Sequence, residues 1–218
     1  MRRLFTLAFV LAAIFSTARA ADPDPLFVDS FDGKLGDGWS WLREDAGAWR
    51  IKDGALEIRV QPGVASNVKN ALVRSAPDRS QGKLAFEITV TNLAPPTQQY
   101  EQAGITWYHN GQPLAKLVKE YIDGKTWIVL GGPTDPDGKR GLAGKTPVDA
   151  PTVRLRLTVT ADRYQAEFQP GEGKFQPAGS GPLPPPRDDQ VSVQCYNGPP
   201  DAEHWFRWDD FRIVKLPE

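Results

Sequence analysis

The stretch Val153-Arg154-Leu155-Arg156-Leu157-Thr158-Val159 alternates apolar and polar residues without a break. An alternation of period two places every apolar side chain on one face of an extended strand. The same pattern recurs at residues 55–60, 84–90 and 164–168, whereas helical periodicity is nearly absent. The sequence therefore predicts an all-β protein whose sheets are apolar on one face.

Short turn signals separate the predicted strands, notably Asp53-Gly54, Asn110-Gly111 and Asp123-Gly124, at spacings that suit antiparallel hairpins. About a dozen strands are expected, which is too many for one flat sheet. We predict two antiparallel sheets packed as a β-sandwich of jelly-roll type, with a closed barrel as the alternative. Residues 131–151 and 177–189, rich in Gly, Pro and Asp, are expected to be long loops of the same domain.

The last predicted strand changes its apolar face. Phe206 and Trp208 share one parity, and the apolar residues after Asp210 share the other, so the face switches at Asp209 and Asp210. Such a switch predicts a bulge or kink. The first strand, within residues 26–33, also ends in acidic residues, and we expect the two terminal strands to pair.

Charge and composition exclude several classes of function. The 218 residues carry 26 Lys+Arg against 27 Asp+Glu, a net charge of -1. This balance lacks the basic footprint of a nucleic-acid-binding protein, so we expect no nucleic acid partner. The only cysteine, Cys195, cannot form an internal disulfide, and we expect it to be a buried small hydrophobe. We expect a monomer.

The first 20 residues have the pattern of a secretory signal peptide. Two arginines precede an apolar run from Leu4 to Phe15, and Ala18-Arg19-Ala20 is a small-x-small cleavage site. A run of about 12 apolar residues is shorter than the roughly 20 that span a bilayer, so we expect no membrane span. The predicted mature chain is one domain, residues 21–218, and is secreted or periplasmic.

Several short motifs along the mature chain carry a family resemblance. They are Phe31-Asp32-Gly33, Gly38-Trp39, residues 49–56, residues 100–105 with the letters YEQAGI, and residues 208–213 with the letters WDDFRI. In this order they resemble the concanavalin A-like lectin/glucanase superfamily, and within it the accessory domains of family 43 glycosidases and small secreted domains of unknown function. The resemblance implies a jelly roll with a concave sheet, and it does not imply catalysis.

The sequence assigns no catalytic residue. A retaining glycosidase needs two carboxylates about 5 Å apart, and the superfamily pattern Glu-x-Asp-x-x-Glu that supplies them is absent. We therefore favour a secreted, non-catalytic domain that binds a polysaccharide or oligosaccharide on its concave sheet. A hydrolase or lyase using Glu101, Glu120 or Tyr108 is one alternative, and a cell-envelope interaction module is another.

The predicted binding residues are aromatic and polar. Sugar rings stack on aromatic side chains, and flanking amides and charges bond their hydroxyl groups. Strand parity in residues 102–108 places Gln102, Thr106 and Tyr108 opposite the apolar face. The predicted ligand-binding set is Gln102, Tyr108, Lys119, Tyr121 and Trp127.

A structural calcium ion is a further possibility raised by the acids of the terminal strands. Asp29, Asp32, Asp209 and Asp210 are the candidate ligands, since Ca²⁺ prefers carboxylate oxygens. The alternative is that these acids only terminate strands and cap turns. No other cofactor is expected, because two histidines and one cysteine make a zinc site improbable.

Overall fold

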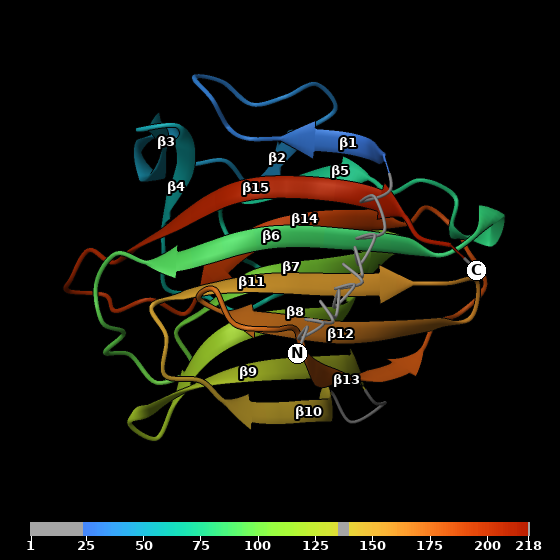
Figure 1. Ribbon diagram of the computed structural model, residues 1–218. Coiled ribbons are helices and arrows are strands. Elements are labelled where there is room, and N and C mark those ends of the chain that lie inside the picture. The colour runs from blue at the N-terminus through green and yellow to red at the C-terminus, as the bar shows by residue number, and fades with distance from the viewer. Residues whose placement is uncertain (1–23, 135–139, 218) are drawn as a thin grey trace, which may run out of the picture.

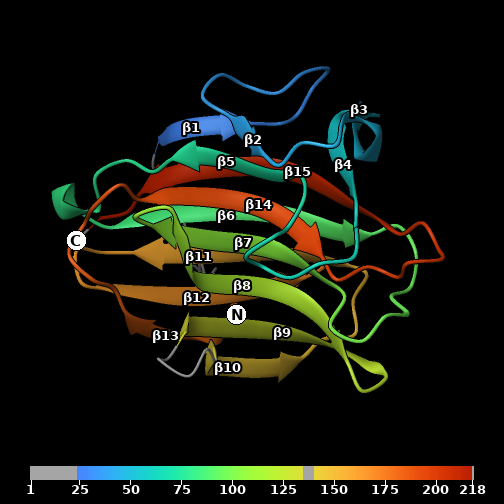
Figure 2. The same ribbon diagram turned by 180° about the vertical axis from the view of Figure 1, so that it is seen from behind.

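The computed structural model describes residues 24–134 and 140–217 and folds them into two packed antiparallel β-sheets (Figures 1 and 2). The predicted all-β sandwich is confirmed. In these ranges sheet A has eight strands, in the order β13-β12-β11-β6-β15-β4-β3 with β1 paired to β15, and sheet B has seven, in the order β10-β9-β8-β7-β14-β5-β2. The predicted signal peptide, residues 1–20, lies outside the described residues.

The strands of sheet A are β1 (Pro25–Asp29), β3 (Trp49–Lys52), β4 (Ala55–Arg59), β6 (Leu84–Asn92), β11 (Thr152–Val159), β12 (Arg163–Pro170), β13 (Gln176–Pro182) and β15 (Trp205–Lys215). Those of sheet B are β2 (Ser40–Leu42), β5 (Ala71–Ser75), β7 (Gln102–His109), β8 (Gln112–Ile122), β9 (Lys125–Thr134), β10 (Arg140–Pro147) and β14 (Gln190–Tyr196). Two short 3₁₀ helices, η1 (Ala46–Ala48) and η2 (Arg79–Gln81), lie in the connections. No helix in the described part of the chain is long and apolar enough to cross a membrane.

The predicted hairpin turns have the expected backbone. At Asn110-Gly111 and Asp123-Gly124 both turn residues have positive φ, at 50° and 73° in the first pair and 51° and 77° in the second. This is the geometry of a type I′ turn, which Asn and Gly or Asp and Gly adopt most easily. The two turns connect β7 to β8 and β8 to β9, and so hold three neighbouring strands of sheet B in register.

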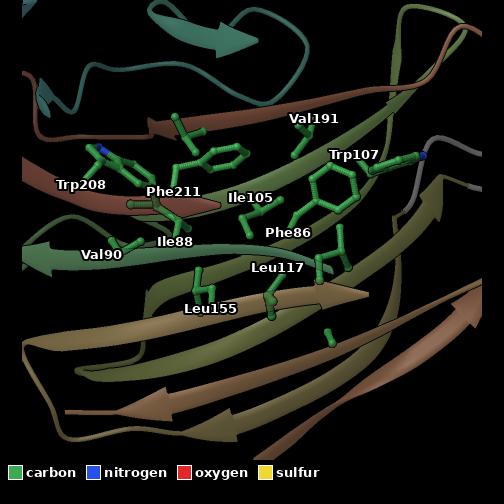
Figure 3. Packing of buried hydrophobic residues seen from close by; sticks show 14 of the residues in the cluster. Phe86, Ile88, Val90, Ile105, Trp107, Leu117, Leu155, Val191, Trp208 and Phe211 are labelled. Carbon is green, nitrogen blue, oxygen red and sulfur yellow. The ribbon is translucent and has the colours of Figure 1, made fainter. Parts of the chain in front are cut away.

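The core lies between the two inner faces and is built from the alternating apolar residues (Figure 3). Phe86 of β6 and Trp107 of β7 meet edge to face across the layers, with ring centroids 5.4 Å apart. Trp208 and Phe211 of β15 are also fully buried. Each such aromatic side chain removes roughly 150–250 Å² from water, so this layer supplies most of the folding free energy.

The bulge predicted in the last strand is confirmed. The pairing of β15 with β6 shifts register between Asp209 and Arg212, and Asp210 has a φ of 54°. The extra residue turns the strand so that Trp208 and Phe211 both face the core. The predicted pairing of the terminal strands is also confirmed, since β1 runs antiparallel to β15.

The expectation of two long loops was wrong in part. Strand β10 lies within the segment 131–151, and β13 begins just before the segment 177–189 and extends into it. Both are edge strands, one in each sheet. An edge strand tolerates Gly and Pro because one side of its backbone needs no ladder partner, so the composition that suggested loops is compatible with pairing.

Candidate functional site

The outer face of sheet B carries polar side chains in aligned rows over its three central strands, β8, β7 and β14. The register pairs Glu120 with Gln102 and Gln102 with Tyr196. Two residues along, it pairs Lys116 with Thr106 and Thr106 with Ser192. Because these residues alternate with the core residues of the same strands, their side chains share the face opposite the core.

Gly104 lies between these two rows and lets strands β7 and β8 approach closely. An added Cβ at Gly104 would collide with the carbonyl oxygen of Leu117 and the Cα of Val118. Its partner on the other side is Gln194. The missing side chain leaves the middle of the polar face to its neighbours.

A charged network occupies one end of this face. Lys116 Nζ donates to Gln102 Oε1 at 2.6 Å and to Glu120 Oε2 at 3.3 Å, and Gln102 Nε2 donates to Glu120 Oε1 at 3.1 Å. The Lys116 ammonium also lies 6.0 Å from the centre of the Tyr196 ring. The pair of opposite charges and the amide between them fix one another's rotamers.

A second network has hydrogen-bonding capacity left over. Gln194 Oε1 accepts from Tyr108 Oη at 3.0 Å and from Ser192 Oγ at 2.9 Å. Gln194 Nε2 and Thr106 Oγ1, however, have no hydrogen-bond partner in the described part of the chain, although Gln194 is 0% and Thr106 1% exposed. An unpartnered buried polar group costs about 1–3 kcal/mol, so these two atoms require a structural or functional reason.

Trp127 flanks the polar face on β9. It pairs with Glu120 across the β8–β9 ladder, which places its indole on the same face. The ring is half-buried, donates Nε1 to the Ile122 carbonyl at 3.2 Å, and has Lys145 Nζ 4.2 Å from its centre. A fixed aromatic plane beside amides and hydroxyls is the arrangement that recognises sugar rings.

The structure separates the predicted binding residues into two groups. Gln102, Tyr108 and Trp127 share the outer face of sheet B. Lys119 and Tyr121 have the opposite parity on β8, since Lys119 pairs with the core residue Ile128. The structure therefore brings three of the five predicted residues together on one face.

Lys119 is buried at the end of the sandwich. Its Nζ donates to the carbonyl oxygens of Ala150 and Pro151 at 2.6 and 2.7 Å. Burial lowers the pKa of Lys119 to about 8, because desolvation disfavours the charged form. These contacts tie β8 to the segment that leads into β11.

The acids considered for catalysis are held by other groups. Glu101 is buried and accepts from His204 Nδ1 at 2.9 Å and from the backbone N–H groups of Thr97 and Gln98. Glu120 is the only carboxylate at the outward positions of the described strands of sheet B. A pair of facing carboxylates for glycoside hydrolysis is thus not formed by those strand positions.

The four aspartates considered for calcium have different surroundings. Asp29 accepts from Phe31 N, Gly36 N and Trp39 Nε1 at 2.7–2.8 Å and so organises the loop after β1. Asp210 pairs with Arg212 and Arg154, at 2.6 and 3.3 Å. The carboxylate of Asp32 lies beside Gly54, and burial raises the pKa of Asp209. No three metal-ligating side chains group together among the residues that the structure describes.

Sequence reasoning missed the contribution of β14. Ser192, Gln194 and Tyr196 lie beside β7, and their parity could have been derived from the alternation of residues 190–196. The neighbour relation could not, because β14 and β7 are more than 80 residues apart in the chain. Lys116 was missed because its network forms only when three strands are in register.

Comparison with known proteins places this fold in a family. Residues 28–183 match the model of the β-xylosidase C-terminal concanavalin A-like domain. The chain belongs to this family. The predicted resemblance to accessory domains of family 43 glycosidases is thereby confirmed.

Solved structures show the same fold at low sequence identity. The GH43 protein BlXynB from Bacillus licheniformis is 18% identical, with a TM-score of 0.75, over 88% of this chain and 40% of that one. A functionally unknown protein from Saccharomyces cerevisiae is 13% identical, with a TM-score of 0.61, over 83% and 98%. The CBM2 module of the evolved Dit of Lactobacillus casei BL23 phage J-1 is 10% identical, with a TM-score of 0.60, over 90% and 98%.

These matches fix the fold and its length relative to its relatives. This concanavalin A-like chain spans about two fifths of the GH43 protein from Bacillus licheniformis, whereas it matches nearly the whole length of the yeast protein and of the phage module. No curated protein matches the chain.

Proposed function

We propose that this concanavalin A-like domain is a non-catalytic accessory domain that binds a polysaccharide or oligosaccharide on the outer face of sheet B. The observation that carries the proposal is the spare hydrogen-bonding capacity of Thr106 Oγ1 and Gln194 Nε2 under a layer of tyrosines. A sugar hydroxyl both donates and accepts, and it reaches such atoms directly or through one bound water.

The aromatic and charged groups around these atoms fit the same ligand. The half-buried indole of Trp127 offers a plane for the C–H face of a sugar ring. Lys116, Gln102 and Glu120 hold one another in place, so they present donors and acceptors with little loss of side-chain entropy on binding. The names of the relatives make xylan the first polysaccharide to test.

The experiment is affinity electrophoresis of the mature chain in gels that contain xylan or one of several other soluble plant, algal and bacterial polysaccharides. Trp127→Ala is the test variant and Trp205→Ala is its matched control. Trp205 is also half-buried and also has a cation, Arg50, 4.2 Å from its ring centre, but it lies on sheet A. We expect one polysaccharide to retard the wild type, Trp127→Ala to weaken retardation at least 5-fold, and Trp205→Ala to leave it unchanged.

Equal weakening by the two tryptophan variants would contradict a site on sheet B. Absence of retardation by every polysaccharide would contradict the binding function itself and would favour an interaction module of the cell envelope. A release of reducing sugar from the retarding polysaccharide would show instead that the domain is an enzyme.

We also propose that the protein acts outside the cytoplasm, since residues 1–20 have the pattern of a signal peptide. N-terminal sequencing of the protein recovered from the periplasm or the medium tests this. The expected first residue is Ala21, and recovery of the uncleaved chain from the cytoplasm would contradict the proposal.

A further inference from the structure

A separate cavity lies on the outer face of sheet A, on the far side of the sandwich from the proposed carbohydrate site. Its volume is about 580 Å³, which is within the range of roughly 300–1,000 Å³ typical of small-molecule sites. Four basic side chains and one carboxylate line it, namely Arg154, Arg156, Lys174, Arg212 and Glu87. The lining is thus strongly positive.

The arginines of this cavity share a smaller number of carboxylates. Glu87 accepts from Arg154 Nη2 at 2.7 Å and from Arg156 Nε at 2.5 Å. Asp210 is shared in the same way by Arg154 and Arg212. One carboxylate between two guanidinium groups leaves each of them only partly neutralised, so a positive potential remains in the cavity.

Two donors of the cavity have no partner. Arg154 Nε is buried without a hydrogen bond, and the exposed ammonium of Lys174 has no partner within the described ranges. Glu167, the other nearby acid, lies 3.5 Å from Arg156 and is already paired with it. An incoming anion therefore finds free donors without breaking an existing ion pair.

The cavity also has a rigid apolar wall. Phe175 lines it, and the guanidinium of Arg156 stacks 3.6 Å from the centre of that ring. Stacking on one side and the bond to Glu87 on the other fix the Arg156 plane before any ligand binds. Val214 and Leu216 continue the apolar surface.

We infer that this cavity binds an anionic sugar, whose carboxylate or sulfate group meets the free donors and whose ring packs on Phe175. Guanidinium groups match the geometry of planar carboxylates and of sulfate oxygens, and the apolar wall suits the C–H face of a pyranose. The carboxylate of a uronic acid and a sulfate ester share this chemistry. The site is independent of the proposed function, because it lies on the other sheet.

The test is isothermal titration or ¹⁵N-detected NMR titration of the mature chain with D-glucuronate, glucose 6-sulfate, inorganic sulfate and glucose at constant ionic strength. Arg156→Gln and Lys174→Gln are the test variants. Arg50→Gln is the matched control, since Arg50 also bonds a buried glutamate, Glu57, and stacks on an aromatic ring, but lies outside the cavity.

We expect glucuronate or glucose 6-sulfate to bind the wild type with a millimolar Kd, and the tighter of the two identifies the anionic group. Each test variant should weaken binding at least 5-fold, and Arg50→Gln should change it less than 2-fold. Equal binding of glucose, equal weakening by Arg50→Gln, or binding of inorganic sulfate as tight as that of the anionic sugars, which indicates an adventitious ion only, would overturn the inference. The sheet B variant Trp127→Ala should leave this binding unchanged.

Discussion

The two outer faces of the sandwich satisfy their polar side chains in opposite ways. Sheet A uses ion pairs across neighbouring strands, such as Arg50 with Glu57 and Arg156 with Glu87. Sheet B uses amides and hydroxyls, and it leaves Thr106 Oγ1 and Gln194 Nε2 without partners. The difference indicates that the polar groups of sheet A mainly stabilise the fold, whereas those of sheet B are retained at a cost in stability for contact with a ligand.

The strongest test of the ionic role of sheet A is Glu87→Gln. The substitution leaves Arg154 and Arg156 without their shared charge partner on a mostly buried carboxylate position. Removing one member of a buried ion pair costs about 3–5 kcal/mol, and since the arginines are about a quarter exposed we expect a loss of about 2–3 kcal/mol in the free energy of unfolding. Urea titration measures it.

Glu167→Gln is the control for this experiment, because that acid is more exposed and makes one longer pair with Arg156. Its loss should stay below about 1 kcal/mol. If Glu87→Gln were as mild as Glu167→Gln, the ion pairs of sheet A would not be its main source of stability.

A second test uses Lys119, a buried cation of sheet B that is bonded to backbone carbonyls. Burial lowers the pKa of Lys119 from 10.5 to about 8. Between these values the unfolded chain binds more protons than the folded one, so the free energy of unfolding should rise with pH, by on the order of 2–3 kcal/mol in total. Below pH 8 the penalty for burying the charge is fully present.

The measurement is urea unfolding at several pH values from 7 to 10.5, with Lys119→Met as the reference that removes the titrating group. The wild type minus variant difference should rise across this window. A difference that falls or stays flat would contradict the assigned burial of the Lys119 charge.

Thr106→Val probes the unpartnered atoms of sheet B. Valine has the shape of threonine and lacks the hydroxyl group, so the substitution removes an unpaired buried polar atom. We expect stability to stay the same or to rise by up to about 1 kcal/mol. Ser192→Ala is the control, because it breaks the bond to Gln194 and should lower stability by about 1 kcal/mol. A loss above 1 kcal/mol for Thr106→Val would show that this hydroxyl stabilises the fold.

The smallest effect is expected at Cys195, which defines the inner boundary of β14. It faces the core directly beside the outward Gln194, and burial raises the pKa of its thiol. The folded protein should therefore react with a thiol reagent such as DTNB only as fast as it unfolds. Fast reaction at pH 8 would mean that the parity of β14, and with it the outer face of sheet B, is incorrectly assigned.

Much of the fold follows from the sequence. Period-two alternation, the Asn-Gly and Asp-Gly turns and the parity switch before Phe211 each depend on neighbouring residues only, and the structure confirms all three. The edge strands β10 and β13 escaped prediction, because glycine and proline mask alternation where pairing is one-sided.

The candidate site was predicted less completely. Gln102, Tyr108 and Trp127 were placed on one face by parity within single strands or hairpins, and the structure puts them there. Lys119 was misplaced because parity along β8 was not carried through from β7. Gln194 depends on a long-range neighbour relation that no local pattern contains.

The most direct test of the carbohydrate face is a ¹H–¹⁵N NMR titration of the mature chain with oligosaccharides of the polysaccharide that retards it most. The account predicts that shift changes cluster on β7, β8, β9 and β14 and include the indole N–H of Trp127. Changes confined to β6, β11 and β15, or to the loops, would contradict a binding site on sheet B.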